Sequence, residues 1–455
     1  MKRRDFIAAA TAGATINAIA HGQDTVNQTF NGLMTISPRG RVPLSFVIDD
    51  STCLVNMGHF CTPQFATAWP KREEYKKPWK EWPREIPDSF VRKFGEWCAD
   101  HGVKGKYSIV PNPACVGWLD RELPGWSRRE LNESLDLVRN LMVPNWDIHP
   151  EMITHTRVIN LKTGRPFEEI SAATMENWYP QTDKSVDELA AYLAYALRIL
   201  KNCGLPCEGI TTPGGFGNAV KEKLSLAVIQ SVADVFPQVD LPHYFKYVQM
   251  GSEADNMIPS LEHARSDKNE LGVVNVPAGT GDWFGGWQGD RESEPDRYLT
   301  ADGQQGRMAE LIRLGVPAVM LCHWPGMYNR GTESGFKAFQ RIVLTLKEVY
   351  GDKTHWMKLS EIGRYYAASE LTKFETKPNG LEIQAPFASA DFTLLFKPTR
   401  PLKGAVLVAD QKVELQQVAN RKDLRAGKYV LLDDKQNTAI CCFDLPKGKS
   451  VLTVR

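Results

Sequence analysis

From Val42 to about residue 368, short apolar runs alternate with segments whose apolar residues recur at helical spacing. The apolar run 42–49 is followed by a helical pattern over 87–101 and then by a second apolar run over 105–110. Buried apolar strands that alternate with amphipathic helices are typical of a parallel sheet covered by helices. The sequence therefore predicts a parallel α/β domain over residues 40–368.

The pattern changes after about Leu371. At least six short alternating runs follow, and they are separated by Gly, Pro, Asp and Asn turns with no helical segment between them. Such a series predicts antiparallel strands, and we expect a β-sandwich accessory domain over residues 372–455. A chain of 455 residues is long enough for one large domain and a second, smaller one.

The N-terminus has the pattern of an export signal. Lys2-Arg3-Arg4-Asp5-Phe6-Ile7 is a twin-arginine motif, and a small, weakly apolar stretch follows it. Ala18-Ile19-Ala20 supplies small residues where a signal peptidase would cut. We therefore expect residues 1–20 to be a twin-arginine export signal and the mature protein to be periplasmic or secreted.

The overall charge limits the classes of partner. The net charge is +1 and the two signs are interspersed, so the chain offers no basic surface for nucleic acid. It also lacks an apolar run of transmembrane length, so no membrane insertion is expected. No protein partner is predicted.

Three strands in the α/β part are predicted to end in residues that can bind a metal ion or move a proton. The first ends at Asp49-Asp50, the second runs into residues 146–155, and the third ends at His323. In an α/β barrel, side chains at the carboxyl ends of different strands meet on one face. Two carboxylates, one or two imidazoles and a spare acid–base pair fit a metal-assisted hydrolase.

The order of these motifs resembles the polysaccharide deacetylase family, that is, carbohydrate esterase family four and its relatives. The resemblance covers about 42–368 and includes the segment His101-Gly102-Val103-Lys104-Gly105 after the first long helix. The family has a Thr-Phe-Asp-Asp motif where this chain has Val47-Ile48-Asp49-Asp50. The resemblance implies a deformed (β/α) barrel, with Asp49 as the general base and Asp50 as a metal ligand.

The second motif departs from the family pattern of two histidines separated by three residues. If His155 is the second histidine, Glu151 occupies the first ligand position. On a helix, residues 151 and 155 would share one face and could grip one ion. The alternative pairs His149 with His155 and leaves Glu151 turned away. The implied cofactor is a divalent metal ion. Zinc is the first expectation, and two carboxylates would also admit harder ions.

The third motif also departs from the family, which carries an arginine two residues before a proline as the partner of the catalytic aspartate. Here Thr211 stands in the place of that arginine, so the partner of Asp49 is lost or comes from elsewhere. Pro213, Gly214 and Gly215 remain, and we expect them to contact substrate, because glycine lets the backbone approach a ligand closely and offer N–H donors to an oxyanion.

Two further motifs complete the resemblance. Asp282-Trp283 would line the substrate groove, and Leu321-Cys322-His323 matches the apolar-apolar-His pattern of the family. By that match His323 is the general acid that protonates the leaving group. Trp283, Trp287 and Trp324 are candidate platforms for a sugar ring.

The leading hypothesis is a secreted, metal-dependent carbohydrate hydrolase that deacetylates a polysaccharide or oligosaccharide. One alternative is a glycoside hydrolase that uses carboxylates such as Asp49 and Glu151 on the same barrel. Another is a carbohydrate-binding protein of the cell envelope without catalytic activity. The sequence leaves these alternatives open.

Overall fold

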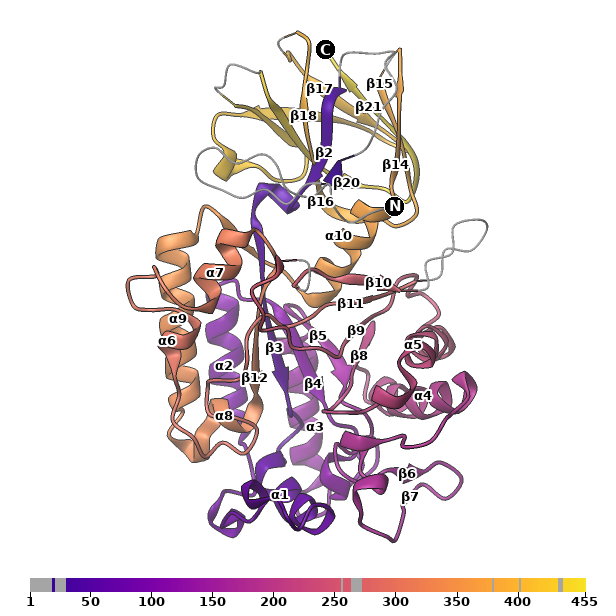
Figure 1. The fold of residues 1–455 in the computed structure, drawn as a ribbon, viewed down its shortest axis with the longest axis vertical. Helices are drawn as coiled ribbons and strands as arrows, with labels where there is room; N and C mark the ends of the chain where they lie inside the picture. Colours follow the sequence, from indigo (N-terminus) through magenta and orange to yellow (C-terminus); the bar gives the residue numbers. More distant parts are fainter. Residues whose placement is uncertain are drawn as a thin grey trace.

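Figure 1 shows a computed structural model with an α/β body at one end and a β-rich body at the other. The structure describes residues 19–20, 30–254, 257–262, 272–378, 380–400, 402–432 and 437–455. Apart from Ile19–Ala20, the predicted export signal lies outside the described residues. No described helix combines the length and apolar character needed to cross a membrane.

A parallel sheet forms the centre of the α/β body. Its order is β12-β3-β4-β5, and β13 also pairs with β3 in parallel. The bounds are β3 (Val42–Asp49), β4 (Gly105–Ile109), β5 (Trp146–Pro150), β12 (Ala318–His323) and β13 (Thr354–Trp356). All eight residues of β3 are buried, because helices cover one side of the sheet and the other side faces the interior of the body.

A second sheet continues the ring of parallel strands. Its order is β10-β11-β9-β8, in which β8, β9 and β11 run parallel and β10 is antiparallel. The bounds are β8 (Gly209–Thr211), β9 (His243–Phe245), β10 (Ser260–Glu262) and β11 (Val273–Asn275). A bridge between Glu151 and Thr211 joins the two sheets on one side, and the Gly279 N–H donates to the Val319 carbonyl oxygen on the other. The prediction of a mixed α/β fold with parallel strands is confirmed.

Helices cover the outside of this ring. The longer ones are α1 (Met57–Ala68), α2 (Asp88–Asp100), α3 (Arg128–Leu137), α4 (Val186–Asn202), α5 (Lys221–Val235), α7 (Arg307–Leu314), α9 (Ser334–Tyr350) and α10 (Leu359–Leu371). Short helices α6 (Pro295–Tyr298) and α8 (Trp324–Tyr328) and the hairpin β6 (Ile159–Asn160) and β7 (Arg165–Pro166) lie in the loops. Ser127 and Glu130 form the capping box that begins α3, as its sequence pattern predicts.

Two helices depart from the sequence-based expectation. The sequence of residues 51–83 is rich in Trp, Pro and Lys and predicts a long irregular loop, but this segment contains α1. This helix carries Gly58 and Pro63, and its weak amphipathic pattern gives little signal of a helix. α5 is not predicted at all, although it packs against α4 and covers the second sheet.

The β-rich body is one continuous path of hydrogen-bonded strands. The path runs β1-β2-β16-β20-β19-β18-β17-β21-β15-β14. The bounds are β1 (Ile19–Ala20), β2 (Asn31–Ile36), β14 (Lys373–Lys377), β15 (Gly380–Ala385), β16 (Ser389–Lys397), β17 (Ala405–Val408), β18 (Lys412–Val418), β19 (Lys428–Leu431), β20 (Ala439–Leu445) and β21 (Gly448–Val454). The path curls over a core that includes Leu381, Phe392 and Phe443.

This arrangement differs from the predicted β-sandwich in two respects. The strands form a single curled path instead of two separate sheets, and β18 pairs with β19 in parallel. In addition, β2 precedes the α/β body in the sequence but pairs with β16 in the β-rich body. The chain therefore enters the β-rich body twice, once before and once after the α/β body. The expected domain boundaries at residues 40, 368 and 372 remain predictions.

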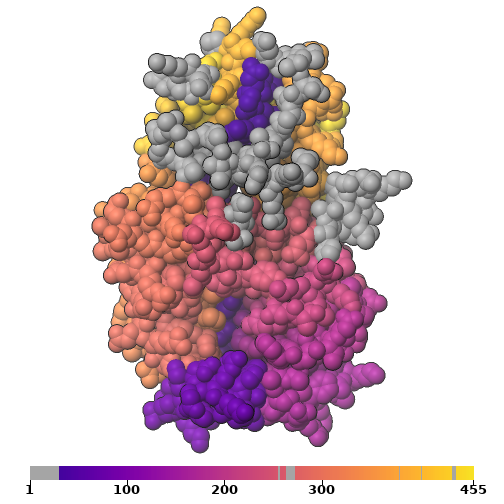
Figure 2. Space-filling view, viewed as in Figure 1, coloured from indigo at the N-terminus to yellow at the C-terminus, as the bar shows by residue number. Residues whose placement is uncertain are grey.

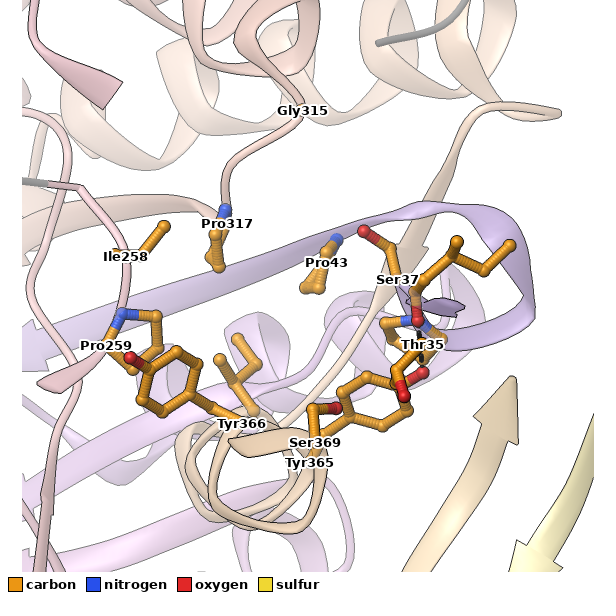
Figure 3. Close-up of a pocket in the computed structure, with 13 residues that line it drawn as sticks. Thr35, Ser37, Pro43, Ile258, Pro259, Gly315, Pro317, Tyr365, Tyr366 and Ser369 are labelled. Carbon is orange, nitrogen blue, oxygen red and sulfur yellow. Dashed lines mark hydrogen bonds between the residues drawn. The ribbon is translucent and has the colours of Figure 1, made fainter. Parts of the chain in front are cut away.

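Tyr365 of α10 ties the two bodies together. Its buried hydroxyl donates to the Ile36 carbonyl oxygen on β2 and accepts from the Thr393 N–H on β16 at 3.2 Å. A small cavity of about 90 Å³ lies beside it. Figure 3 shows Tyr365 and Ser369 on one side of that cavity and Pro43 on the other.

We expect Tyr365→Phe to lower the free energy of unfolding by about 1–3 kcal/mol, because a buried carbonyl and a buried N–H lose their shared partner. Urea unfolding followed by circular dichroism measures the effect. Tyr195→Phe, at a half-buried position on α4, is the control. Equal free energies of unfolding for the wild type and Tyr365→Phe would contradict the proposed role of the Tyr365 hydroxyl in joining the two bodies.

Candidate functional site

The carboxyl ends of the parallel strands open into one cavity of about 300 Å³. Its lining includes Asp49, Asp50, Phe65, Tyr75, Glu151, His155, Asn177, Thr212, Pro213, Gly214, Phe245, Lys246, Val248, Trp287, Leu321 and His323. Figure 2 shows the surface hollowed between the magenta and orange segments, with indigo atoms of the N-terminal segment at the floor. The predicted convergence of strand-end residues on one face is therefore what the structure shows.

Two carboxylates and one imidazole form a compact group within this cavity. His155 Nε2 lies 3.0 Å from Asp50 Oδ1 and 3.2 Å from Glu151 Oε1. One potential ligand atom from each of the three residues lies within 4.8 Å of the other two. All three residues are buried, so their charges interact in a medium of low polarity.

The backbone at this group is held in an uncommon conformation. Asp50 has a φ of +93° and His155 a φ of +62°, and both are in the region that favours glycine. The prediction that Glu151 and His155 share a helical face is wrong, because residues 152–155 form an irregular turn. The two side chains meet because this turn folds back on the end of β5, and such strain is commonly concentrated at functional sites.

A buried carboxylate that the sequence analysis missed holds this turn in place. Glu176 accepts hydrogen bonds from the backbone N–H groups of Ile153, Thr154 and His155 at 3.1, 3.0 and 2.6 Å. The Tyr192 hydroxyl donates to the same carboxylate at 2.5 Å. Glu176 lies 21 residues after His155, and the sequence between them gives no periodic signal that would connect the two.

The side chains of Asp50, Glu151 and His155 offer ligand atoms that suit a divalent cation. Asp50 Oδ2 is buried and has no hydrogen-bond partner. Burial alone would lower the pKa of His155, but Asp50 and Glu151 outweigh it and raise that pKa well above its usual value. The same negative potential attracts a metal ion, which would compensate two buried carboxylates. Two oxygen ligands and one nitrogen ligand suit zinc and also harder ions.

Asp49 has a partner that the sequence analysis did not identify. The fully buried ammonium of Lys106 donates to Asp49 Oδ1 and also to Ser108 Oγ at 2.7 Å. The Ser108 hydroxyl donates to the same Asp49 oxygen at 3.2 Å. Burial raises the pKa of Asp49, and Lys106 opposes that rise. The cation expected at position 211 is thus supplied by the neighbouring strand β4.

His323 is oriented by Asp282. Its Nδ1 lies 2.7 Å from Asp282 Oδ2, and the same oxygen accepts the His323 backbone N–H at 3.2 Å. Burial alone would lower the pKa of His323, but Asp50 and Asp282 outweigh it and raise the pKa to about 9. Asp282 does not line the cavity, so the structure places it behind His323 and not at the predicted groove surface.

His149 does not join the Asp50, Glu151 and His155 group. Its Nε2 lies 2.7 Å from His243 Nε2, and its Nδ1 lies 3.2 Å from Thr211 Oγ1. Burial lowers the pKa of both histidines, that of His243 to about 4. The alternative pairing of His149 with His155 is therefore not what the structure shows, because the His149 ring points into the interior between β5, β8 and β9.

The predicted substrate-contact residues divide into two sets. Pro213 and Gly214 line the cavity, whereas the Gly215 N–H is already bonded to the Asn177 carbonyl oxygen at 2.8 Å. Gly215 therefore cannot supply that N–H to an oxyanion.

Of the three tryptophans proposed as sugar platforms, Trp287 lines the cavity, whereas Trp283 and Trp324 do not. Trp324 is fully buried against Phe90, Phe94 and Tyr107, so its predicted role as a sugar platform is wrong. Trp283 packs on Tyr298, outside the cavity lining. The aromatic side chains that do line the cavity are Trp287, Tyr75, Phe65 and Phe245.

Comparisons with known proteins give remote likenesses only. No protein-family model matches the chain, and no curated protein matches it. Among solved structures, a putative polysaccharide deacetylase from Mycobacterium smegmatis is 13% identical with a TM-score of 0.38, covering 74% of this chain and 95% of that one. The 4-alpha-glucanotransferase from Thermococcus litoralis is 12% identical with a TM-score of 0.36, covering 71% and 40%. Agd3, described as a novel carbohydrate deacetylase, is 11% identical with a TM-score of 0.43, covering 93% and 66%. At these values the likenesses establish neither a family nor an activity.

The positions of Glu151 and His149 predict that a substitution of Glu151 weakens metal binding more than a substitution of His149. We expect Glu151→Gln to weaken divalent-ion affinity by about tenfold to a hundredfold or more, because a charged ligand becomes a neutral amide. His155→Ala should abolish retention of the ion. His149→Ala should change affinity less than Glu151→Gln, since its ring lies outside the group. Titration of the folded variants with zinc measures all three, and the reverse ranking of Glu151 and His149 would contradict the assignment.

Proposed function

We propose that this chain is a metal-dependent hydrolase that removes acetyl groups from a polysaccharide or oligosaccharide. The observation that carries the proposal is the convergence of three chemical groups in one cavity. These are the Asp50, Glu151 and His155 donors, the Asp49 carboxylate with its Lys106 partner, and the His323 imidazole with its Asp282 partner. This combination supplies a metal-ligand set, a general base and a general acid.

Asp50, Glu151 and His155 would hold the divalent ion, and zinc is our first expectation. When bound, such an ion supplies Lewis acidity, which acidifies a water molecule and polarises an acyl carbonyl. The Glu176 hydrogen bonds to the 153–155 turn keep the His155 backbone fixed. A ligand set held in this way loses little order when the ion binds.

Asp49 is the proposed general base. Both of its hydrogen bonds, from Lys106 and Ser108, are accepted by Oδ1. Oδ2 is therefore available to take the proton of the attacking water. Burial favours the protonated form of this carboxyl and so strengthens it as a base, while the ammonium of Lys106 favours its ionised form.

His323 is the proposed general acid. Because Asp282 engages Nδ1, the other ring nitrogen is the one that can face the cavity. Asp282 accepts a hydrogen bond from the ring and favours its protonated form, as a proton donor to a departing amine or alkoxide requires.

The glycoside hydrolase alternative is less well supported by this geometry. It needs Asp49 and Glu151 as the acid–base pair, but Glu151 is engaged by His155 and by the Asp50 N–H at 3.1 Å. The binding-protein alternative does not account for a buried base, acid and ligand group in the same cavity. We also propose export by the twin-arginine route, on the motif at residues 2–7.

The function is tested by measuring acetate release from a panel of acetylated glycans with the full-length protein, before and after removal of metal by a chelator. We expect release that is lost with the metal and recovered with zinc. Release that is insensitive to metal removal, or new reducing ends without acetate, would overturn the proposal.

Lys106 provides a sharper test of the base. Lys106→Met should lower kcat by about a hundredfold with little change in KM, because Asp49 loses the contact that positions it. Lys106→Arg should recover part of the loss, since it retains the cation. Lys104→Met is the matched control. The Lys104 ammonium lies 3.0 Å from a Glu361 carboxylate oxygen, and neither residue lines the cavity.

A double variant separates positioning from general damage. If Lys106 acts through Asp49, Lys106→Met should add little to the loss caused by Asp49→Asn. Additive losses in acetate-release assays would instead show that Lys106 acts independently of Asp49.

We expect His323→Ala to reduce turnover by about a hundredfold to ten-thousandfold, the range that one general acid contributes, with metal content unchanged. An activated aryl acetate needs little protonation of its leaving group, so the variant should retain more of its activity on that substrate. His101→Ala, at the end of α2, is the control. An equal loss on activated and unactivated substrates would argue against the general-acid role.

A further inference from the structure

One wall of the cavity carries polar groups that the proposed reaction does not use. They are Thr212, which follows β8, Lys246, which follows β9, and Asn177, which lies in the short helical turn 176–178. Thr212 is 5% exposed, and its hydroxyl oxygen has no hydrogen-bond partner. The side-chain oxygen of Asn177 is likewise buried and unpartnered. Unused hydrogen-bonding groups on a cavity wall indicate a place for a ligand group.

Lys246 differs in its charge balance from Lys106, the buried lysine beside Asp49. The Lys106 ammonium has the carboxylate of Asp49 as its counter-charge. Lys246 is 9% exposed, and its ammonium donates to the Phe216 carbonyl oxygen. Within the described part of the chain, no ion pair involves Lys246, and the charge that acts on it is the like charge of Lys221.

A buried ammonium without a counter-charge is costly, and an anionic ligand offsets that cost. Burial and Lys221 lower the pKa of Lys246 to about 8, so most of the side chain still carries its proton at pH 7. One ammonium and one hydroxyl match the two oxygens of a carboxylate. Arginine, whose planar guanidinium suits the geometry of a phosphate, is absent from the described lining.

We propose that Lys246 and Thr212 form a subsite for the carboxylate of a uronic acid residue, so that the substrate is an acetylated acidic glycan. The inference deepens the proposed deacetylase function and rests on it. In this arrangement Lys246 and Thr212 donate to the carboxylate, and the Asn177 oxygen accepts from a neighbouring sugar hydroxyl. Trp287 and Tyr75 provide aromatic surface in the same cavity for the sugar ring.

A matched pair of polymers tests the subsite in the metal-loaded wild type. One is acetylated polygalacturonic acid, and the other is the same polymer with its carboxylates reduced to primary alcohols. We expect kcat/KM for acetate release to be at least about tenfold higher on the acidic polymer, the factor that one hydrogen bond to a charged group contributes. Equal rates, or a preference for the reduced polymer, would overturn the inference.

Variants then assign the preference to the side chain. In Lys246→Met the ratio of the two kcat/KM values should fall to about one, and in Lys246→Arg it should be largely kept. Lys223→Met is the matched control, because it removes a lysine of α5 that pairs with Asp183 at 2.6 Å outside the cavity lining, and its ratio should match the wild type. An unchanged ratio in folded Lys246→Met would overturn the assignment.

Binding without turnover keeps this inference separate from the proposed function. Calorimetric titration with unacetylated oligogalacturonate measures the subsite even in a protein that releases no acetate. We expect binding that weakens at least about tenfold in Lys246→Met and with added salt. Failure to release acetate together with such binding would reject the deacetylase and retain the subsite, whereas no binding by the wild type would reject the subsite.

Discussion

The balance of buried charge at the carboxyl ends of β3 and β5 controls the rest of this site. Asp49, Asp50 and Glu151 place three carboxylates close together where little water reaches them. Each must be compensated, because an isolated buried charge costs several kcal/mol. Lys106 compensates Asp49, and His155 lies between Asp50 and Glu151. A divalent ion would complete this balance of charge, so the arrangement fits a metal site better than it fits simple core packing.

The backbone is built around the same requirement. Asp50 and His155 both adopt positive φ angles. This backbone conformation is strained for a residue other than glycine, so surrounding contacts must offset the strain. Glu176 supplies the compensation for the 153–155 turn by accepting three consecutive N–H groups that would otherwise be buried without partners. The carboxylate of Glu176 thus has a structural role, because it holds His155 in position beside the carboxylates of Asp50 and Glu151.

Strand-end residues could be predicted from the sequence because they follow apolar runs directly. Asp49, Asp50, Glu151, His155 and His323 all meet at the expected face. Partners that lie on other elements could not be predicted. Lys106 occurs in the run Gly105-Lys106-Tyr107, where a lysine in a strand would ordinarily be expected at a surface. The crossing of β2 into the β-rich body was missed for a related reason, since strand pairing over more than 350 residues leaves no local trace.

The register of the sheet explains why Lys106 on β4 can reach Asp49, although the sequence motif places the expected cation at position 211. Val47 is paired with Lys106, so Asp49 lies two residues beyond that pair, on the same face of the sheet. A long, flexible lysine reaches this distance along the strands, and Ser108, two residues further on, closes the same contact. Thr211 is then free to bond His149, and the space near β8 is filled by an interior pair of histidines. A cation that the motif places on one strand can therefore be supplied by another strand, provided that the second strand presents it in the right register.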